Sequence, residues 1–366
     1  MIQFSPLLPC TLALILGIIW QAIGMVPWLA LVFLSIMVVA FFARHYTYAT
    51  VIAVATTFFI AGALRYEQQK NSFEQFIQTG CDTSCALTAS VDDIEVSYRS
   101  PGVSILTVTI VDMQHKNISI SAANGFQLKI ATKQPVDHLH PGDIISCPKI
   151  FLRAPTHESY KRYLIKEHLA GHATTQRAIT VLQRPTYSVT SWLAQQRNAV
   201  LQQAHAKLSP TTFTLFASIF WGKKELDAYY MNPIKEQFKI WGILHYLARS
   251  GLHVLLFVIL WAWLLAWLPL PFAIKQIILT LLIMSYHLLS WPSVSFMRSL
   301  VMFLCYKACC IYNLQINVLH LLALTCMGIL LINPFQLFFL DFQLSFGLTF
   351  ALAWLTMLQK QKLLIP

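Results

Sequence analysis

Long apolar runs alternate with one extended polar region along this chain. Each run is long enough, or nearly so, to cross a hydrocarbon layer of about 30 Å as a helix, and the polar region extends from Arg65 to about Lys239. The pattern predicts about eight membrane spans, at Leu7–Met25, Val26–Ala43, Tyr48–Leu64, Ile240–Leu268, Phe272–Leu289, Val294–Tyr312, Ile316–Ile332 and Phe335–Leu358. We expect a polytopic α-helical membrane protein, whose first run lacks the basic flank of a signal peptide.

The polar region reads first as β structure and then as helix. From Cys85 to about Thr180, short segments rich in Val, Ile and Thr are separated by turn residues, which predicts a small inserted barrel or sandwich, such as an OB-like β domain. Ser159–Gln176 includes a short basic helix, and Tyr187–Leu208 is a polar helix. Thr211–Trp221 is apolar but too short to span, so it lies on the membrane surface or re-enters. We divide the chain into three amino-terminal transmembrane helices (1–64), the β domain (65–184), a helical connector (185–239) and the carboxyl-terminal membrane core (240–366).

Composition and charge support this division. The chain is 57% hydrophobic and 11% charged, far from the roughly 25% charged residues of soluble domains. Asp341 is the only acidic residue outside the polar region, and the net charge of +11 suits an anionic substrate or anionic lipid. Arg44, Lys360 and Lys362 fit the positive-inside rule, which places both termini in the cytoplasm and the β domain on the extracytoplasmic side of the membrane.

Three cysteines of the polar region are candidates for a disulfide in an oxidising compartment. Cys81 and Cys85 are close in sequence, Cys147 can pair with either, and the sequence does not decide between these pairings. No set of Cys and His residues has the spacing of a zinc site, and no Walker A loop, GxSxG elbow or dinucleotide fingerprint is present. We therefore expect no metal, no cofactor and no enzymatic activity.

Two polar stripes interrupt the apolar helices. His245, Arg249 and His253 recur at every fourth position and therefore share one helix face, as do Asp341, Ser345 and Thr349 in the last run. Ionisable groups inside a membrane are costly, so such stripes indicate a polar path or a partner on another helix. Arg249 and Arg298 are the natural partners of Asp341, and a pair of this kind can line a pore or simply lock two helices together.

In the polar region, the basic side chains of the short helix are candidates for phosphate contacts, although they equally suit a solvated face. These are Lys161, Arg162 and Lys166.

The motifs around these residues resemble the ComEC family of competence proteins. His245–Val254 (HYLARSGLHV) is similar to that family's HLLAxSGLHV motif, and Pro292–Met302 and Asp341–Phe346 (DFQLSF) resemble two further family segments in the same order. Tyr160–Thr174 resembles the end of the family's extracytoplasmic domain. The sequence departs from the family at Tyr246, Arg249 and Ser299.

The resemblance implies an inner-membrane channel that passes single-stranded DNA into the cytoplasm during natural transformation, with an OB-type extracytoplasmic domain and 240–366 as the channel core. OB barrels bind single strands by stacking and basic grooves, for which Tyr98, Phe126 and Phe151 are available. A periplasmic DNA receptor, a cytoplasmic motor and a separate nuclease are the expected partners, since the family's metallo-β-lactamase-like domain is not in this sequence. The residues expected to line the channel or contact DNA are His245, Arg249, Ser250, Gly251, His253, Arg298, Asp341, Gln343 and Ser345.

Three alternatives remain open at this stage. The chain is a truncated, inactive remnant of such a channel, a membrane-embedded enzyme that uses His245 and His253, or a small-solute transporter. The enzyme needs a third group that converges on the histidines, and the transporter is disfavoured because no internal repeat is visible.

Overall fold

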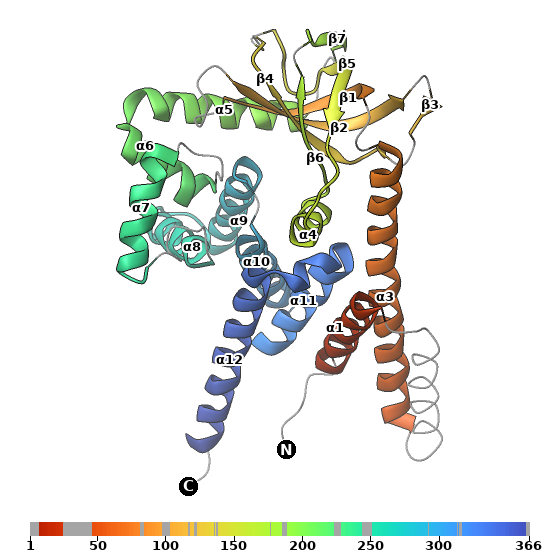
Figure 1. The fold of residues 1–366 in the computed structure, drawn as a ribbon. Coiled ribbons are helices and arrows are strands. Elements are labelled where there is room, and N and C mark those ends of the chain that lie inside the picture. The colour runs from red at the N-terminus through yellow and green to blue at the C-terminus, as the bar shows by residue number, and fades with distance from the viewer. Residues whose placement is uncertain are drawn as a thin grey trace. The chain divides into compact units, whose positions relative to one another are not determined.

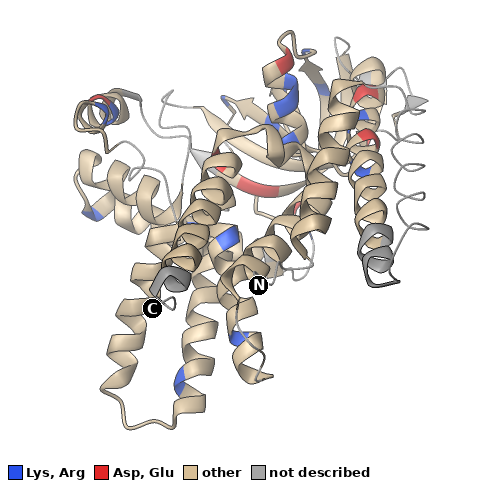
Figure 2. Ribbon diagram, turned by 90° about the horizontal axis from the view of Figure 1, so that it is seen from below, with Lys and Arg blue, Asp and Glu red and all other residues tan. Residues whose placement is uncertain are grey.

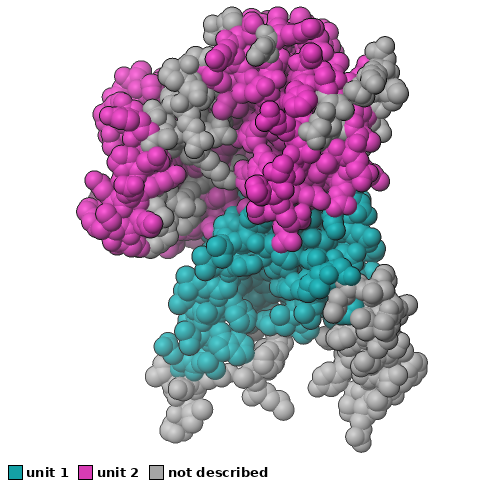
Figure 3. Space-filling view, viewed as in Figure 1, with its two compact units in different colours: residues 1–71, 297–366 teal, residues 72–296 magenta. Residues whose placement is uncertain are grey.

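The computed structural model divides into two compact units, residues 1–71 with 297–366 and residues 72–296 (Figures 1 and 3), and each is described by itself. The described residues are 7–24, 46–80, 84–96, 103–115, 118–120, 123–134, 136, 138–175, 177–184, 189–222, 228–243, 251–291, 293–312, 314 and 317–363.

The first unit is helical. Its elements are α1 (Leu7–Ile23), the first part of α3 (Tyr46–Gly80), most of α10 (Val294–Ile311), α11 (Val318–Ile332), the 3₁₀ turn η4 (Pro334–Phe338) and α12 (Leu340–Leu363). Two glycines allow α1 and α3 to approach closely. A Cβ atom at Gly17 would lie 2.1 Å from the Phe59 carbonyl oxygen, and one at Gly62 would lie 2.6 Å from that of Leu14. Only glycine fits at either position, which is the small-residue packing common between membrane helices.

The end of α11 is held by α3. Arg65 Nε donates to the Leu331 carbonyl at 3.1 Å, and Tyr66 stacks on Phe335 of η4 with ring centroids 4.5 Å apart. A cation at the carboxyl end of a helix satisfies a carbonyl that lacks an intrahelical partner and interacts favourably with the helix dipole. This contact fixes the turn between α11 and α12.

Among the described residues, three helices are long and apolar enough to cross a membrane, namely Phe272–Leu289, Val294–Ile311 and Leu340–Gln359. They coincide with three of the eight predicted spans. Three further predicted spans correspond to shorter apolar helices, Leu7–Ile23, Gly251–Ala266 and Val318–Ile332. Tyr48–Leu64 lies within α3, and Val26–Ala43 lies outside the described residues.

The predicted span Ile240–Leu268 is wrong in its first part. α7 (Ala228–Ile240) ends at Ile240, and Gly242, at φ 69°, closes it with a pair of bonds from Gly242 N to Lys239 O and from Ile243 N to Phe238 O. This 5→2 and 6→1 pattern is the Schellman ending, which needs a residue in the left-handed region. The apolar helix α8 is described over Gly251–Ala266, and residues 244–250 of the predicted span lie outside the described residues.

The second unit contains a closed β barrel, where the sequence predicts a barrel or sandwich. Its strands are β1 (Ser84–Val96), β2 (Ser104–His115), β4 (Gln127–Thr132), β5 (Ile144–Leu152) and β6 (Leu169–Thr175). They form the ring β1-β2-β4-β6-β5-β1, with β4 and β6 parallel and the other ring pairs antiparallel. The short strands β3 (Ile118–Ser119) and β7 (Thr180–Gln183) add to β2 and β5.

Alternating side chains fill the barrel. Leu128 and Ile130 of β4 and Leu106 and Val108 of β2 are fully buried, whereas the residues between them face outward. This period of two is the strand alternation that the sequence shows. The parallel pairing of β6 with β4 requires a crossover, which is formed by β5 and the helix α4 (Glu158–Lys166) that connects β5 to β6.

A bulge in β1 points two adjacent carboxylates in different directions. The register of β1 against β2 shifts between Val91 and Asp93, so Asp92 is the extra residue. Asp92 Oδ2 accepts hydrogen bonds from Thr109 Oγ1 at 2.6 Å and from Gln127 Nε2 at 3.2 Å, both on the outer face of the barrel. Burial raises the pKa of the Asp92 carboxyl above its ordinary value, and these two hydrogen bonds partly oppose that rise.

Asp93 instead joins the barrel to the helix α5 (Val189–Lys207), which lies along the barrel in Figure 1. Its Oδ2 is 2.7 Å from Arg197 Nη2 and its Oδ1 accepts from Asn198 Nδ2 at 3.1 Å; Asp93 is buried, and the Arg197 side chain is 15% exposed. The Arg197 guanidinium also lies over the ring of Trp291, 4.3 Å from the centroid. One buried ion pair thus links a strand, a helix and the segment that follows α9 (Phe272–Leu289).

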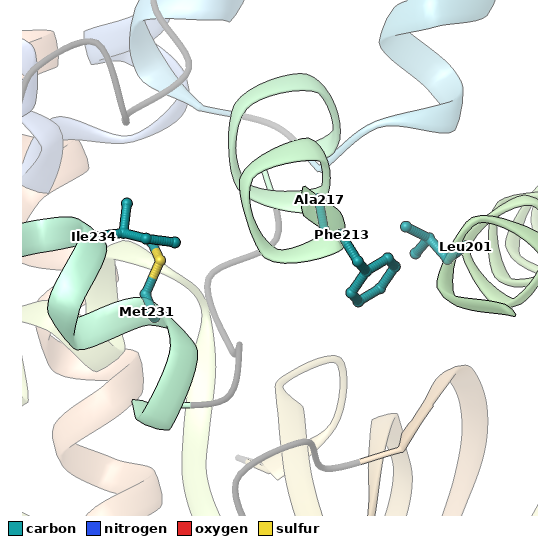
Figure 4. Close-up of a cluster of buried hydrophobic side chains, with 5 residues drawn as sticks. All are labelled: Leu201, Phe213, Ala217, Met231 and Ile234. Atoms are coloured by element: carbon teal, nitrogen blue, oxygen red, sulfur yellow. The ribbon is translucent and has the colours of Figure 1, made fainter. Parts of the chain in front are cut away.

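Apolar residues of α5, α6 (Pro210–Phe216), the π-helical turn η2 (Ala217–Trp221) and α7 form a second core of this unit (Figure 4). Phe213 points toward Leu201 of α5, and Ala217 is fully buried beside it. Trp221 O accepts from Trp291 N at 2.9 Å, and Phe220 O accepts from the Tyr286 hydroxyl at 2.7 Å. The short apolar segment Thr211–Trp221 therefore packs within a helical core and against α9.

Replacing Arg197 tests the buried ion pair. Arg197→Met keeps much of the packing on Trp291 but leaves the Asp93 carboxylate buried and unpaired, so we expect a loss of about 3–5 kcal/mol of unfolding free energy. Thermal and denaturant unfolding of the purified chain measures this loss. Adding Asp93→Asn should restore part of it, and equal stability of Arg197→Met and the parent would contradict the assignment.

The Asp92 carboxyl predicts a pH dependence of stability. Because its folded pKa lies above its unfolded value, its contribution is complete at low pH and is lost as the pH rises through the folded pKa. Asp92→Asn should therefore melt higher than the parent at neutral pH, and the difference should shrink as the pH falls toward about 4. Thr109→Val, which removes a donor to the carboxylate, should shift the melting temperature downward at neutral pH. A lower melting temperature of Asp92→Asn at every pH would refute this prediction.

Candidate functional site

The first polar stripe lies mostly outside the described residues. His245, Arg249 and Ser250 are not described, whereas Gly251 opens α8 and His253 lies half-buried in its first turn. The convergence of this stripe on a channel therefore stays a prediction. Within the second unit, α8 packs on α9 through Phe257 and Tyr286, whose rings stack at 4.6 Å.

The second stripe meets Arg298 inside the first unit. Arg298 Nη1 donates to the Ser345 carbonyl and to the Thr349 hydroxyl, and the guanidinium lies 5.7 Å from the ring centroid of Phe346. Thr349 in turn donates to the Ser345 carbonyl at 2.7 Å. Helices α10 and α12 are thus joined by a polar contact through Ser345 and Thr349, whereas the sequence favours Asp341 as the partner of Arg298.

Arg298 keeps one unused donor. Its Nε is buried and has no hydrogen-bond partner in the described part of the chain. A buried N–H without a partner is uncommon and costs free energy, so it marks a position that a further acceptor can satisfy. The polar contact is therefore a structural link between α10 and α12 that leaves one buried donor unsatisfied.

Two other predicted residues of α12 lie apart from Arg298. Asp341 is exposed in the first turn and is not among the contacts of Arg298. Gln343 is exposed, and its Nε2 donates to the Leu337 carbonyl of η4 at 2.9 Å. Lys307, further along α10, lies over the ring of Phe303 at 5.3 Å.

The three cations of the basic helix α4 all have acidic neighbours. Lys161 Nζ is 2.9 Å from Glu74, Arg162 Nε is 3.6 Å from Glu158, and Lys166 Nζ is 3.7 Å from Glu167. Lys166 is also buried. A phosphate that bound to this helix would have to compete with carboxylates already in place.

The aromatic residues proposed for stacking differ in exposure. Tyr98 lies outside the described residues. Phe126 packs against Phe73 and Phe76, with ring centroids at 5.9 and 5.5 Å. Phe151 on β5 is 45% exposed, and of the two described rings it is the one that is open to a ligand.

The cysteines of the barrel lie on neighbouring strands. Cys85 and Cys147 are buried on β1 and β5, where Cys147 is paired in register with Leu87 rather than with Cys85. Cys147 is a free thiol, and burial raises its pKa to about 11. The predicted disulfides that include Cys147 are therefore not formed in the structure, and Cys81 lies outside the described residues.

Sequence reasoning missed Arg65 and the Asp93–Arg197 pair. Arg65 is the first charged residue after an apolar run, which is a visible signal for a helix-end contact. The ion pair carries no such signal, because its members belong to segments about a hundred residues apart.

In the described structure, charged residues are few on the apolar helices and more frequent on the other segments. Figure 2 shows apolar helices with few coloured positions, whereas basic and acidic residues gather on the barrel and the elements next to it. Large apolar side chains are exposed along α8, including Leu255, Ile259 and Trp263. Such a surface suits a lipid environment, where every backbone polar group must be satisfied inside a helix.

Comparison with known proteins gives one family. Residues 227–364 match the sequence family described as Competence protein. No curated protein and no solved structure matches the chain. The match and the apolar helices indicate a membrane protein with a role in DNA uptake for competence. Residues 227–364 thus carry the domain of the competence-protein (ComEC) family, as the motifs in this part of the sequence predict.

Proposed function

We propose that this chain is an inner-membrane channel that passes single-stranded DNA into the cytoplasm during natural transformation. The observation that carries the proposal is the match of residues 227–364 to the competence family. It supports DNA as the transported molecule and the membrane as the place of action. In this proposal the termini are cytoplasmic, the β barrel is extracytoplasmic, and a DNA receptor, a motor and a separate nuclease act with the chain.

The Arg298 contact suggests how such a channel handles phosphate. A strand that crosses the membrane loses the hydration of its phosphates, so the path must offer cationic and hydrogen-bonding groups in its place. Arg298 offers a buried, unused Nε donor and a charge held in place by Ser345 and Thr349. One weak site of this kind lets a strand move on, whereas a site with many strong contacts would hold it.

The barrel fits the same proposal. Its five-stranded closed ring agrees with an OB-like fold, and OB barrels commonly bind single strands. We place the barrel ahead of the channel on the DNA's route. No covalent chemistry is needed for passage, so the chain acts here as a conduit and not as an enzyme.

Deleting the gene tests the proposed step. Labelled double-stranded DNA given to the deletion strain should bind to cells and reach the periplasm, but it should not appear in the cytoplasmic fraction. Normal uptake into the cytoplasm would overturn the proposal and would favour an inactive remnant.

Substituting Arg298 tests the phosphate role within the channel. Arg298→Gln should lower DNA uptake into the cytoplasm on the order of tenfold, because it removes the one charge in this contact. Arg298→Lys, which keeps the charge, should retain most of the uptake, and Thr349→Val, which loosens the helix contact but keeps the charge, should do the same. The measurement is transformation frequency at matched membrane protein levels.

The relative effects of these substitutions on DNA uptake distinguish a phosphate site from a structural contact between helices. If Thr349→Val lowers uptake as strongly as Arg298→Gln does, the contact is a lock between α10 and α12. Lys307→Leu on the same helix is the control for loss of any cation from α10, and unchanged uptake in Arg298→Gln would reject the phosphate role.

A further inference from the structure

The outer face of β5 carries an exposed aromatic ring between two exposed cations. Lys149, Phe151 and Arg153 alternate with the buried Ile150 and Leu152. Alternate residues of a strand point to the same side, so Lys149 and Phe151 share the outer face of the barrel. Arg153 is exposed and follows directly after the last residue of β5. We call this set the β5 strip.

The neighbours of Phe151 leave its ring accessible. In the sheet register Phe151 pairs with Ser84 of β1 on one side and with Thr174 of β6 on the other. Both are small, polar and exposed. An aromatic side chain that is 45% exposed between small neighbours offers a ring face on which a base can stack.

Two more exposed cations lie near one end of the strip. Thr132 and Thr175 pair at the carboxyl ends of β4 and β6, and Lys133 and Arg177 follow them closely. The Thr175 hydroxyl lies 3.4 Å from the Lys149 carbonyl and 3.5 Å from the Arg177 carbonyl, which brings these backbone segments together. The ends of β4 and β6 therefore add positive charge beside Lys149.

These cations differ from those of α4 in their partners. The four cations of this surface are Lys133, Lys149, Arg153 and Arg177. In the part of the chain that the structure describes, no carboxylate lies within 4.0 Å of any of them, whereas each cation of α4 has one. Unpaired surface cations are the ones whose counterions a bound phosphate chain releases.

The outer side of β1 and β2 is less suited to an anion. The outer side of β1 and β2 carries Asp92 and Asp112, which accept hydrogen bonds from Gln127 and Gln114. A polyanion is repelled there and attracted to β5. The charge of the barrel is thus divided between an acidic β1–β2 side and a basic β5 side.

We propose that the β5 strip, together with Lys133 and Arg177, binds single-stranded DNA on the outside of the barrel. The cations contact phosphates, and Phe151 stacks on a base. This inference rests on the proposed function, and it names the surface that receives the strand. A membrane surface is the less suitable ligand, because such binding needs a broad apolar face that enters the headgroup layer, whereas Phe151 stands between polar neighbours.

The binding test uses the full chain in phosphatidylcholine nanodiscs and a fluorescent oligothymidine of about 20 nucleotides, followed by anisotropy at several salt concentrations. Lys149→Gln with Arg153→Gln should weaken binding about tenfold or more and reduce the slope of log K against log salt by about 1.4. Phe151→Ala should weaken binding by about 5- to 100-fold with little change in that slope, and Phe151→Trp should preserve binding.

The matched control removes two cations from α4. Lys161→Gln with Arg162→Gln changes net charge by the same amount, and it should leave affinity and salt slope near those of the parent. If this control loses binding and the strip variant does not, the DNA surface is α4 and the proposal is overturned. All substituted side chains of the strip are exposed, so a shared melting temperature verifies that the variants are folded.

A second assay uses fluorescent phosphatidylglycerol vesicles in place of the oligonucleotide. If the strip variants lose vesicle capture but bind the oligonucleotide as the parent does, the strip is a lipid-binding surface and the proposal is overturned. If the strip variants lose oligonucleotide binding while deletion of the gene leaves DNA uptake normal, the β5 strip is supported and the channel function fails. If all variants bind the oligonucleotide equally while deletion of the gene abolishes DNA uptake, the β5 strip is rejected and the channel function is supported.

Discussion

The second unit depends on the buried ion pair between Asp93 and Arg197. A barrel of five strands has its own apolar interior, but nothing in that interior connects it to the helices that follow. The pair makes this connection because neither ion can be left alone: removing one partner leaves a desolvated charge, which costs far more than the intact pair contributes. Arg197 extends the connection to Trp291 through its guanidinium face, where lysine would lack the planar group.

Charge pairing also separates surfaces that look alike in sequence. α4 is the most basic short helix of the polar region, yet Lys161, Arg162 and Lys166 are all engaged by carboxylates. The cations of the β5 strip are fewer than those of α4 and are separated by other residues in the sequence. In the described structure, however, no carboxylate contacts them. The availability of a cation, and not its local density, decides where a phosphate chain can bind.

The sequence predicts much of the fold because its signals are local. The period of two in segments such as Gln127–Thr132 identifies strands, and long apolar runs identify α9, α10 and α12. The sequence starts an apolar span at Ile240, although α7 ends there and Gly242 adopts the left-handed conformation that closes this helix. The stripe spacing places Asp341, Ser345 and Thr349 on one face of α12, but it does not tell which of them contacts Arg298. The Asp93–Arg197 pair is not predicted either, because no local pattern records contacts between distant segments.

The bulge in β1 has a consequence for the order in which the chain matures. Asp93, which follows the bulge, is synthesised about a hundred residues before Arg197, which must still emerge from the ribosome. Until α5 arrives, Asp93 stays hydrated, and the barrel that carries it is less stable than in the finished protein. The barrel therefore reaches its full stability only after the chain beyond it has been made, so a chain stalled before residue 197 presents a less stable domain to proteases.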